Sequence, residues 1–256
     1  MIPSDAPGTC LVLEKVSKHF GGLRAVDGVT LEIRAGERRA IIGPNGAGKT
    51  TLFNLITGEF PVTAGRIWFF GQEITHLPPH RRAALGIGRT FQITNLFPKL
   101  TVLENVLLAV QGLRPTKYVM HRPIWGYPEL QQQARHLIER VGLWEKRDLP
   151  LTNLSYGEQR QVEVLLALAG GPKLLLLDEP TAGLSPGETR VIVEIIRSLD
   201  PTITVLLIEH DMDVAFEVAD RITVLHFGRV LAEGTKAEIK ANREVQNIYL
   251  GAGTGS

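Results

Sequence analysis

The sequence contains one cysteine and almost no net charge. A single thiol, Cys10, excludes an internal disulfide framework, so the fold has to rely on its apolar core and suits a reducing compartment. The formal net charge of +1 excludes the broad basic field by which many proteins bind nucleic acid or an anionic membrane surface. We therefore expect no nucleic-acid partner for this chain.

Long apolar runs are also missing from the sequence. The most apolar stretch, 162–177, contains Glu163, Gly170, Pro172 and Lys173, whereas a membrane-spanning helix needs about 20 apolar residues. The first residues (MIPSDAPGTC) lack both the positive and the apolar segment of a signal peptide. We expect the chain to stay inside the cell, so that any membrane-spanning part of a complex comes from other subunits.

The chain of 256 residues has an ordinary globular composition, with 44% hydrophobic and 21% charged residues. Apolar patterning predicts alternating strands and helices toward both ends of the chain and mostly helices over 93–159, which indicates an α/β core with a helical insertion. Strands are expected at 11–16, 29–33, 39–42, 174–177, 203–208 and from 222, a hairpin at 65–71, helices at 49–57, 101–110, 131–141 and 185–199, and a surface loop at 112–128.

A glycine-rich segment at 43–50 (GPNGAGKT) matches the pattern G-x-x-x-x-G-K-[ST] in full. It lies between an expected strand and an expected helix, the context that distinguishes a phosphate-binding loop from a chance glycine-rich turn. Glycines let backbone N–H groups turn toward anionic oxygens, while Lys49 can reach the β- and γ-phosphates and the Thr50 hydroxyl can ligate Mg²⁺. The expected nucleotide contacts are Gly43, Pro44, Asn45, Gly46, Ala47, Gly48, Lys49, Thr50 and Thr51.

Two adjacent acids, Asp178 and Glu179, follow the apolar run 174–177. Ligands of open α/β sheets bind at the carboxyl ends of strands, so these acids are expected in the same site as the phosphate loop. Asp178 is suited to hold the Mg²⁺ shell, and Glu179 to polarise the attacking water as a general base. The alternative, two acids that merely end a strand at the surface, is disfavoured by the phosphate loop.

The segment 154–159 (LSYGEQ) is a capping box, in which Ser155 caps a helix and Glu158 follows three residues later. A helix N-terminus is a second potential phosphate site. The segment follows the phosphate loop and a helical insertion and precedes the two acids. This order resembles the ABC ATPase family, whose LSGGQ-like signature it is similar to, with Tyr156 where glycine is usual. The resemblance implies nucleotide contacts by Ser155, Tyr156, Gly157 and Glu158.

Other residues match that family in the same order. Gln92 resembles the Q-loop glutamine, which contacts Mg²⁺ and water and senses the membrane subunit. His210 resembles the switch histidine that contacts the γ-phosphate, and Phe20 stands where the family stacks an aromatic ring on adenine. Taken alone, Gln92 would be an ordinary polar loop residue, His210 a structural residue and Phe20 a core residue. Ser185 departs from the family, because it stands where the D-loop usually carries aspartate, and it also has the position of a helix cap.

The resemblance covers about 11–250 and implies a P-loop NTPase fold of the ABC type, with an α/β core, an antiparallel β subdomain and an inserted helical subdomain. The chain, 1–256, is then a single ATPase domain. We expect its catalytic core at 11–92 and 160–240, the helical subdomain with the signature at 93–159, and a C-terminal tail at 241–256.

Six softer matches are FGGLRAV at 20–26, RTFQ at 89–92, TVLEN at 101–105, AGL at 182–184, IEHDM at 208–212 and YLG at 249–251. Together they resemble the ATPases of branched-chain amino acid importers, the LivG type more than the LivF type. This resemblance implies ATP and Mg²⁺ as cofactors and a peripheral position at the cytoplasmic face of the inner membrane. The implied partners are transmembrane permease subunits, a second ATPase subunit (a LivF-like sister or a second copy) paired head to tail and, indirectly, a solute-binding protein.

Other functions share parts of this pattern. Sister importers for urea, short amides or aromatic acids share much of it, so the solute stays open. Non-transport ABC ATPases of DNA repair need a long coiled-coil insertion, and those of translation carry two cassettes in one chain; this sequence has neither. A small P-loop kinase would lack the segment 154–159. The sequence therefore favours ATP hydrolysis that energises solute import.

Overall fold

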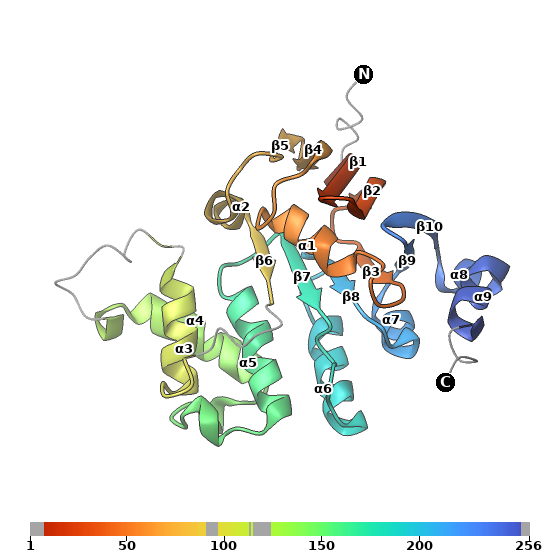
Figure 1. The fold of residues 1–256 in the computed structure, drawn as a ribbon. Helices are drawn as coiled ribbons and strands as arrows, with labels where there is room; N and C mark the ends of the chain where they lie inside the picture. The colour runs from red at the N-terminus through yellow and green to blue at the C-terminus, as the bar shows by residue number, and fades with distance from the viewer. Residues whose placement is uncertain (1–7, 91–96, 113, 115–123, 252–256) are drawn as a thin grey trace.

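The computed structural model describes residues 8–90, 97–112, 114 and 124–251. Two β-sheets lie side by side, and helices α3, α4 and α5 gather at one end of the molecule (Figure 1). Within these ranges no helix has the length and apolar character needed to cross a membrane.

The smaller sheet is antiparallel, in the order β2-β1-β4-β5. On β2 the buried residues Val29, Leu31 and Ile33 alternate with exposed ones, so one face packs on the core and the other faces solvent. This sheet is the antiparallel β subdomain expected from the sequence. Its strands are β1 (Thr9–Phe20), β2 (Leu23–Arg34), β4 (Ala64–Phe69) and β5 (Gln72–Glu73).

The larger sheet has the order β10-β9-β3-β8-β7-β6 and is parallel except for the pair β9–β10. Every residue of β7 and β8 is buried, because helices or the smaller sheet cover both faces. Its strands are β3 (Arg38–Ile42), β6 (Ile87–Arg89), β7 (Leu174–Asp178), β8 (Thr204–Ile208), β9 (Arg221–His226) and β10 (Arg229–Gly234).

Local sequence features explain where helices α1 and α6 begin or end. Helix α1 begins at Lys49 and ends before Gly58, which has a φ of 82°, and α6 begins after Ser185, whose capping box forms in full. The α-helices are α1 (Lys49–Thr57), α2 (Pro79–Leu85), α3 (Val102–Gly112), α4 (Pro128–Arg140), α5 (Tyr156–Leu168), α6 (Pro186–Arg197), α7 (Met212–Val218), α8 (Lys236–Ala241) and α9 (Arg243–Gly251). Short 3₁₀ turns lie at Ile124–Gly126, Trp144–Lys146 and Leu151–Asn153.

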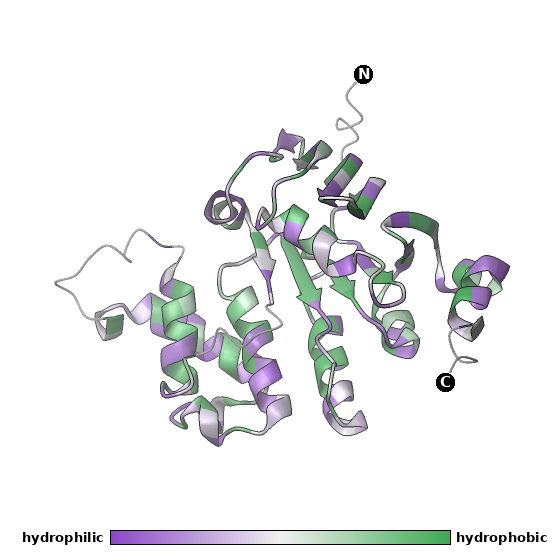
Figure 2. Ribbon diagram, viewed as in Figure 1, coloured by the Kyte–Doolittle hydropathy of each residue, from purple (hydrophilic) through white to green (hydrophobic). Residues whose placement is uncertain are grey.

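The core lies on both faces of the larger sheet. On β7, Leu175 and Leu177 face a cluster built with α3 to α7, while Leu174 and Leu176 face a second cluster built with α1 and the smaller sheet. Figure 2 shows these central strands as a continuous hydrophobic region. A continuous apolar strand between two covered faces is what the run 174–177 predicts.

Several expected boundaries differ from the structure. Strands β1 and β2 have 12 residues each, longer than 11–16 and 29–33, because their pairing continues through polar residues as far as the Phe20–Leu23 pair. Helix α2 and strand β6 were not expected, since each is short and lacks a clear period. Most of the expected loop 112–128 lies outside the described residues. Helix α5 crosses the boundary expected between 159 and 160.

Candidate functional site

The topology brings three loops together at the carboxyl edge of the larger sheet. Strand β8 lies between β3 and β7 and is parallel to both. The segment 43–50 follows β3, Asp178 ends β7 and Glu179 follows it, and His210 follows β8. Adjacent parallel strands end at the same edge, so these segments, distant in sequence, face one site.

The loop at 43–50 needs glycine at two close approaches. A Cβ atom at Gly43 would lie 2.2 Å from the carbonyl oxygen of Leu225, and one at Gly48 would lie 2.2 Å from that of Ala25. Gly48 is also the N-cap of α1, with a φ of 98° that other residues rarely adopt. The glycines therefore let the loop pass between β9 and β2 and end at the helix N-terminus.

Lys49 is almost fully buried, at 6% exposure, in the first turn of α1. Its Nζ donates hydrogen bonds to the carbonyl oxygens of Gly43 (2.7 Å) and Pro44 (3.1 Å), so the ammonium group lies across the loop. Burial lowers the pKa of Lys49, and the carboxylates of Glu179 and Asp178 oppose that shift. A buried ammonium group beside a helix N-terminus is suited to an anionic ligand.

A cleft of about 350 Å³ opens above this loop. It contains the segment Asn45–Thr51 and Glu179, so the structure brings most of the expected loop contacts and the proposed base into one hollow. Gly43, Pro44 and Phe20 are not among its lining residues. The lining residues are Leu23, Arg24, Ala25, Asn45, Gly46, Ala47, Gly48, Lys49, Thr50, Thr51, Glu179 and Phe227.

Asp178 is buried beside the cleft and is held by the end of β6. Its Oδ2 atom lies 3.1 Å from Nη2 of Arg89, and its backbone N–H donates to the Thr90 hydroxyl at 3.2 Å. Burial raises the pKa of Asp178, and the Arg89 guanidinium opposes the shift. Its Oδ1 atom is buried and has no hydrogen-bond partner among the residues that the structure describes. One carboxylate oxygen is thus anchored and the other is left for a ligand.

Glu179 has a left-handed backbone, with a φ of 48°. Its N–H donates to the carbonyl oxygen of Ile208 at 3.0 Å, and one carboxylate oxygen lies 3.9 Å from Nδ1 of His210. A strained conformation of a non-glycine residue persists where surrounding contacts hold it, and such residues cluster at functional sites. The structure thus brings His210 next to Glu179, which lines the cleft, although His210 itself is not among the lining residues.

Glu209 is a site residue that the sequence analysis did not single out. It has no exposed surface, and its Oε1 accepts hydrogen bonds from the N–H (3.3 Å) and hydroxyl (2.9 Å) of Thr181. Burial raises its pKa from 4.5 to about 7. Because Thr181 lies two residues after Glu179, this contact fixes the loop that carries the proposed base. The only signal in the sequence is an acid directly after the apolar run 203–208.

Replacing Glu209 by glutamine should change how stability depends on pH. The folded-state pKa of about 7 lies above the ordinary 4.5, so ionisation of Glu209 removes stability as pH rises through this range. We expect the free energy of unfolding of Glu209→Gln, relative to the unsubstituted protein, to rise by about 2–3 kcal/mol between pH 5 and pH 8. Urea denaturation at both pH values measures this difference, and a difference independent of pH would contradict it.

The signature segment forms the N-terminus of α5. The Ser155 hydroxyl accepts a hydrogen bond from the N–H of Glu158 at 3.3 Å, and the Glu158 carboxylate accepts one from the N–H of Ser155 at 3.0 Å, so the expected capping box is confirmed. A Cβ at Gly157 would lie 2.5 Å from the carboxylate of Glu188, so a side chain there would have to displace Glu188. Tyr156 packs on Gly183 and is 47% exposed. None of these residues lines the cleft of the same chain.

Phe20 and Gln92 are the remaining expected site residues. Phe20 is 44% exposed at the end of β1, where its ring packs edge-on against Phe60 with centroids 5.5 Å apart and Lys18 lies over it. Gln92 falls in 91–96, outside the described residues. The adenine contact of Phe20 and the metal contact of Gln92 therefore stay predictions.

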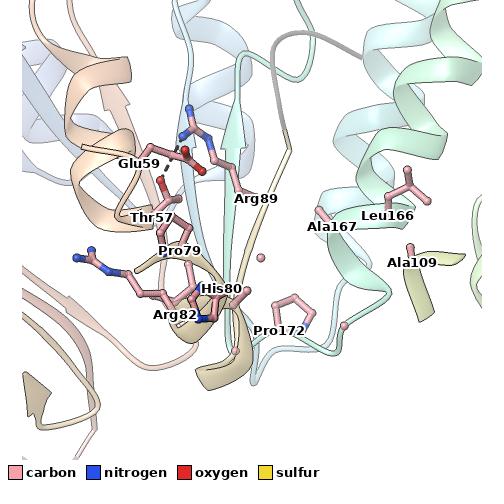
Figure 3. A pocket seen from close by; sticks show the side chains of 15 residues that line it. Thr57, Glu59, Pro79, His80, Arg82, Arg89, Ala109, Leu166, Ala167 and Pro172 are labelled. Carbon is pink, nitrogen blue, oxygen red and sulfur yellow. Dashed lines mark hydrogen bonds between the residues drawn. The ribbon is translucent and has the colours of Figure 1, made fainter. Parts of the chain in front are cut away.

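A second cavity, of about 400 Å³, lies between α1, α2 and β6 of the catalytic core on one side and helices α3 and α5 of the helical segment on the other. Thr57 and Arg89 line it from the core, and Ala109, Leu166 and Ala167 line it from α3 and α5 (Figure 3). Arg89 Nη1 donates to the Thr57 hydroxyl at 3.4 Å and to Asn54 Oδ1 at 2.5 Å, while its Nη2 contacts Asp178. One guanidinium group thus connects this cavity, helix α1 and the acid beside the cleft.

Comparisons with known proteins agree with this geometry. The profile of the family described as ABC transporter matches residues 26–182, which include the phosphate loop, the signature segment and both acids. Among curated proteins, the chain is 41% identical over 248 residues to the high-affinity branched-chain amino acid transport ATP-binding protein LivG of Salmonella typhimurium, covering 94% of this chain and 97% of that one. It is 40% identical over 248 residues, with the same coverage, to the corresponding protein BraF of Pseudomonas aeruginosa.

Solved structures match along nearly the same length. The ADP conformation of an ATP-binding cassette of an ABC transporter superposes with a TM-score of 0.84 at 33% identity, covering 95% of this chain and 99% of that one. A dimeric cassette bound to ADP and Pi superposes with a TM-score of 0.74 at 29% identity, covering 88% and 98%. From the profile, the identity over almost the whole chain and the shared fold, this chain belongs to the ABC transporter family, as an ATP-binding cassette.

Proposed function

We propose that the chain binds and hydrolyses ATP as the energising subunit of an ABC importer for branched-chain amino acids. The observation that carries this proposal is the cleft, which is lined by residues 45–50 of the phosphate loop, among them the buried Lys49, and by the strained Glu179. The solute class rests on LivG and BraF, whose names state branched-chain amino acid transport. Importers of urea, amides or aromatic acids are the alternative.

The residues beside the cleft fit Mg²⁺. Mg²⁺ prefers oxygen ligands, and the buried Oδ1 of Asp178 has no hydrogen-bond partner among the described residues. Thr50 supplies a hydroxyl from the first turn of α1, and Gln92 is the proposed amide ligand. When bound, Mg²⁺ neutralises charge on the β- and γ-phosphates.

We assign roles to the other residues, supported by where they lie. Lys49 exchanges its two carbonyl partners for the phosphates, which are stronger acceptors because they are charged. Glu179 accepts the proton of the attacking water, and His210, beside it, contacts the γ-phosphate. Glu209 holds the loop after Glu179 through Thr181 and acts only as a positioning residue.

We propose a head-to-tail pair of cassettes. The segment 155–158 does not line the cleft of its own chain, yet it forms a helix N-terminus, which favours an anion. In a pair, this helix end of one subunit meets the phosphates bound by the other. ATP then stabilises the closed pair, and hydrolysis removes the bridging phosphate. The second subunit is a LivF-like sister or a second copy of this chain.

We place the contact with the permease at the cavity between the core and the helical segment (Figure 3). Support comes from its mostly apolar walls and from Arg89, which joins it to Asp178. The chain thus lies peripherally on the cytoplasmic face of the membrane, and a solute-binding protein delivers the solute from the other side.

An affinity-tagged chain, purified from detergent-solubilised membranes of its own organism, should bring polytopic membrane subunits and a second ATPase with it. Ala167→Arg should abolish this association, because it puts a charge into the apolar cavity. The matched control, Val191→Arg on the exposed part of α6, should keep it. Mass spectrometry identifies the bound proteins.

Ribosomal proteins or DNA in place of membrane subunits would refute the transport function. Thermal-shift assays of the solute-binding protein that is encoded beside the permease then identify the transported solute, because a bound solute raises the melting temperature of that protein. Leucine, isoleucine and valine should stabilise it, and a response only to urea, an amide or an aromatic acid would support the alternative importer.

A further inference from the structure

The turn between β9 and β10 carries an unusual residue. His226 pairs with Arg229, so the turn consists of Phe227 and Gly228, with φ values of 45° and 76°. Such a two-residue turn favours asparagine, aspartate or glycine at its first position, because other side chains are strained at positive φ. The phenylalanine is also 78% exposed, more than any other large hydrophobic residue in the described part of the chain. Its ring packs on one side against His226, with centroids 4.2 Å apart, but remains largely exposed, so neither turn geometry nor burial in the core accounts for the phenylalanine.

The turn is fixed to the phosphate loop. The N–H of Gly228 donates to the carbonyl oxygen of Ala47 at 3.0 Å, and the carbonyl oxygen of Gly228 accepts from the N–H of Asp27 at 2.9 Å. The Asp27 carboxylate in turn lies 2.7 Å from Nη2 of Arg229. Phe227 is therefore held at a constant position relative to the loop that binds the phosphates.

Phe227 lies between two hollows: it lines the same cleft as that loop and also a pocket shared with His226 and Arg229. Besides Phe227, the residues that line the cleft outside the segment 45–51 are Leu23, Arg24, Ala25 and Glu179. The apolar residues among them, Phe227, Leu23 and Ala25, suit the part of a nucleotide that has no phosphate. Phe20 is not among the residues that line this cleft, and its ring packs against Phe60.

We propose that Phe227 contacts the purine nucleoside part of the bound nucleotide, with Leu23 and Ala25 beside it. The inference rests on the proposed binding of ATP and adds a residue that determines affinity for the nucleoside. An aromatic face stacks on a base with little need for hydrogen bonds, and a ring held by a rigid turn loses little freedom when the base binds.

The test uses Phe227→Asn, because asparagine suits this turn and should keep or raise the melting temperature. We expect about tenfold weaker binding of ATP by titration calorimetry, since a stacked base contributes on the order of this factor or more. Binding of inorganic tripolyphosphate, which has no nucleoside, should stay unchanged. Phe227→Tyr should restore the affinity for ATP, because it keeps the ring.

The chain offers a matched control in Phe70. It also precedes a glycine in a two-residue turn, with a φ of 45°, but it packs against Phe69 in the smaller sheet, away from the cleft. Phe70→Asn should bind ATP and tripolyphosphate as the unsubstituted protein does. Unchanged ATP affinity in Phe227→Asn, or an equal loss for ATP and tripolyphosphate, would overturn the proposal. Failure of the unsubstituted chain to bind ATP would instead refute the proposed function.

Discussion

Replacing Glu179 by glutamine should lower steady-state ATP hydrolysis by about 10²- to 10⁴-fold, the contribution typical of a general base. Glutamine has nearly the same shape but cannot accept a proton from water. The residue lines the cleft beside the phosphate loop, and its strained backbone is held by Ile208, so the substitution should leave the loop in place. ATP affinity should therefore stay close to that of the unsubstituted protein.

Two measurements check this expectation. Phosphate release at saturating ATP gives the turnover, and titration calorimetry gives the affinity. Glu194→Gln is the control, since Glu194 is exposed on α6 outside the site, and it should hydrolyse ATP normally. A Glu179→Gln protein with ordinary turnover would show that another group activates the water.

Replacing Lys49 by alanine should weaken the binding of ATP itself, by about 10- to 100-fold, because it removes charged hydrogen bonds to the phosphates. The side chain is buried, and its Nζ lies 2.7 Å from the carbonyl oxygen of Gly43, at the start of the phosphate loop. Hydrolysis at limiting ATP should fall at least in proportion. The two substitutions thus separate binding from chemistry within one cleft.

Titration of the Lys49→Ala protein with ATP, and with ADP for comparison, measures this effect. The carbonyl oxygens of Gly43 and Pro44 lose their donor, so thermal unfolding has to confirm that the variant is folded at the assay temperature. Lys240→Ala, an exposed change on α8, should bind ATP normally. An unchanged dissociation constant for ATP in Lys49→Ala would exclude the proposed phosphate contact.

Arg89 contacts the proposed metal ligand Asp178 and also lines the cavity that we propose for the permease contact. It anchors one oxygen of this acid. Thr90, the next residue, accepts a hydrogen bond from the Asp178 N–H. The end of β6 therefore connects the proposed metal ligand to that cavity.

Local chemistry was readable from the sequence alone. The phosphate loop, the capping boxes at Ser155 and Ser185 and the acids after the run 174–177 each depend on residues a few positions apart. Their backbone and side-chain requirements are met within one short segment, so a pattern of a few residues specifies them. The order of these segments along the chain then sufficed to indicate the fold class and the family.

Only the tertiary structure decided which distant segments meet. It placed β8 between β3 and β7, joined Glu209 to Thr181 and Arg89 to Asp178, and brought Phe227 into the cleft of the phosphate loop. These contacts join residues far apart in the chain, and they arise from how strands pair and helices pack around the core. No short pattern encodes that packing, because each contact depends on the positions of all the elements between its two residues.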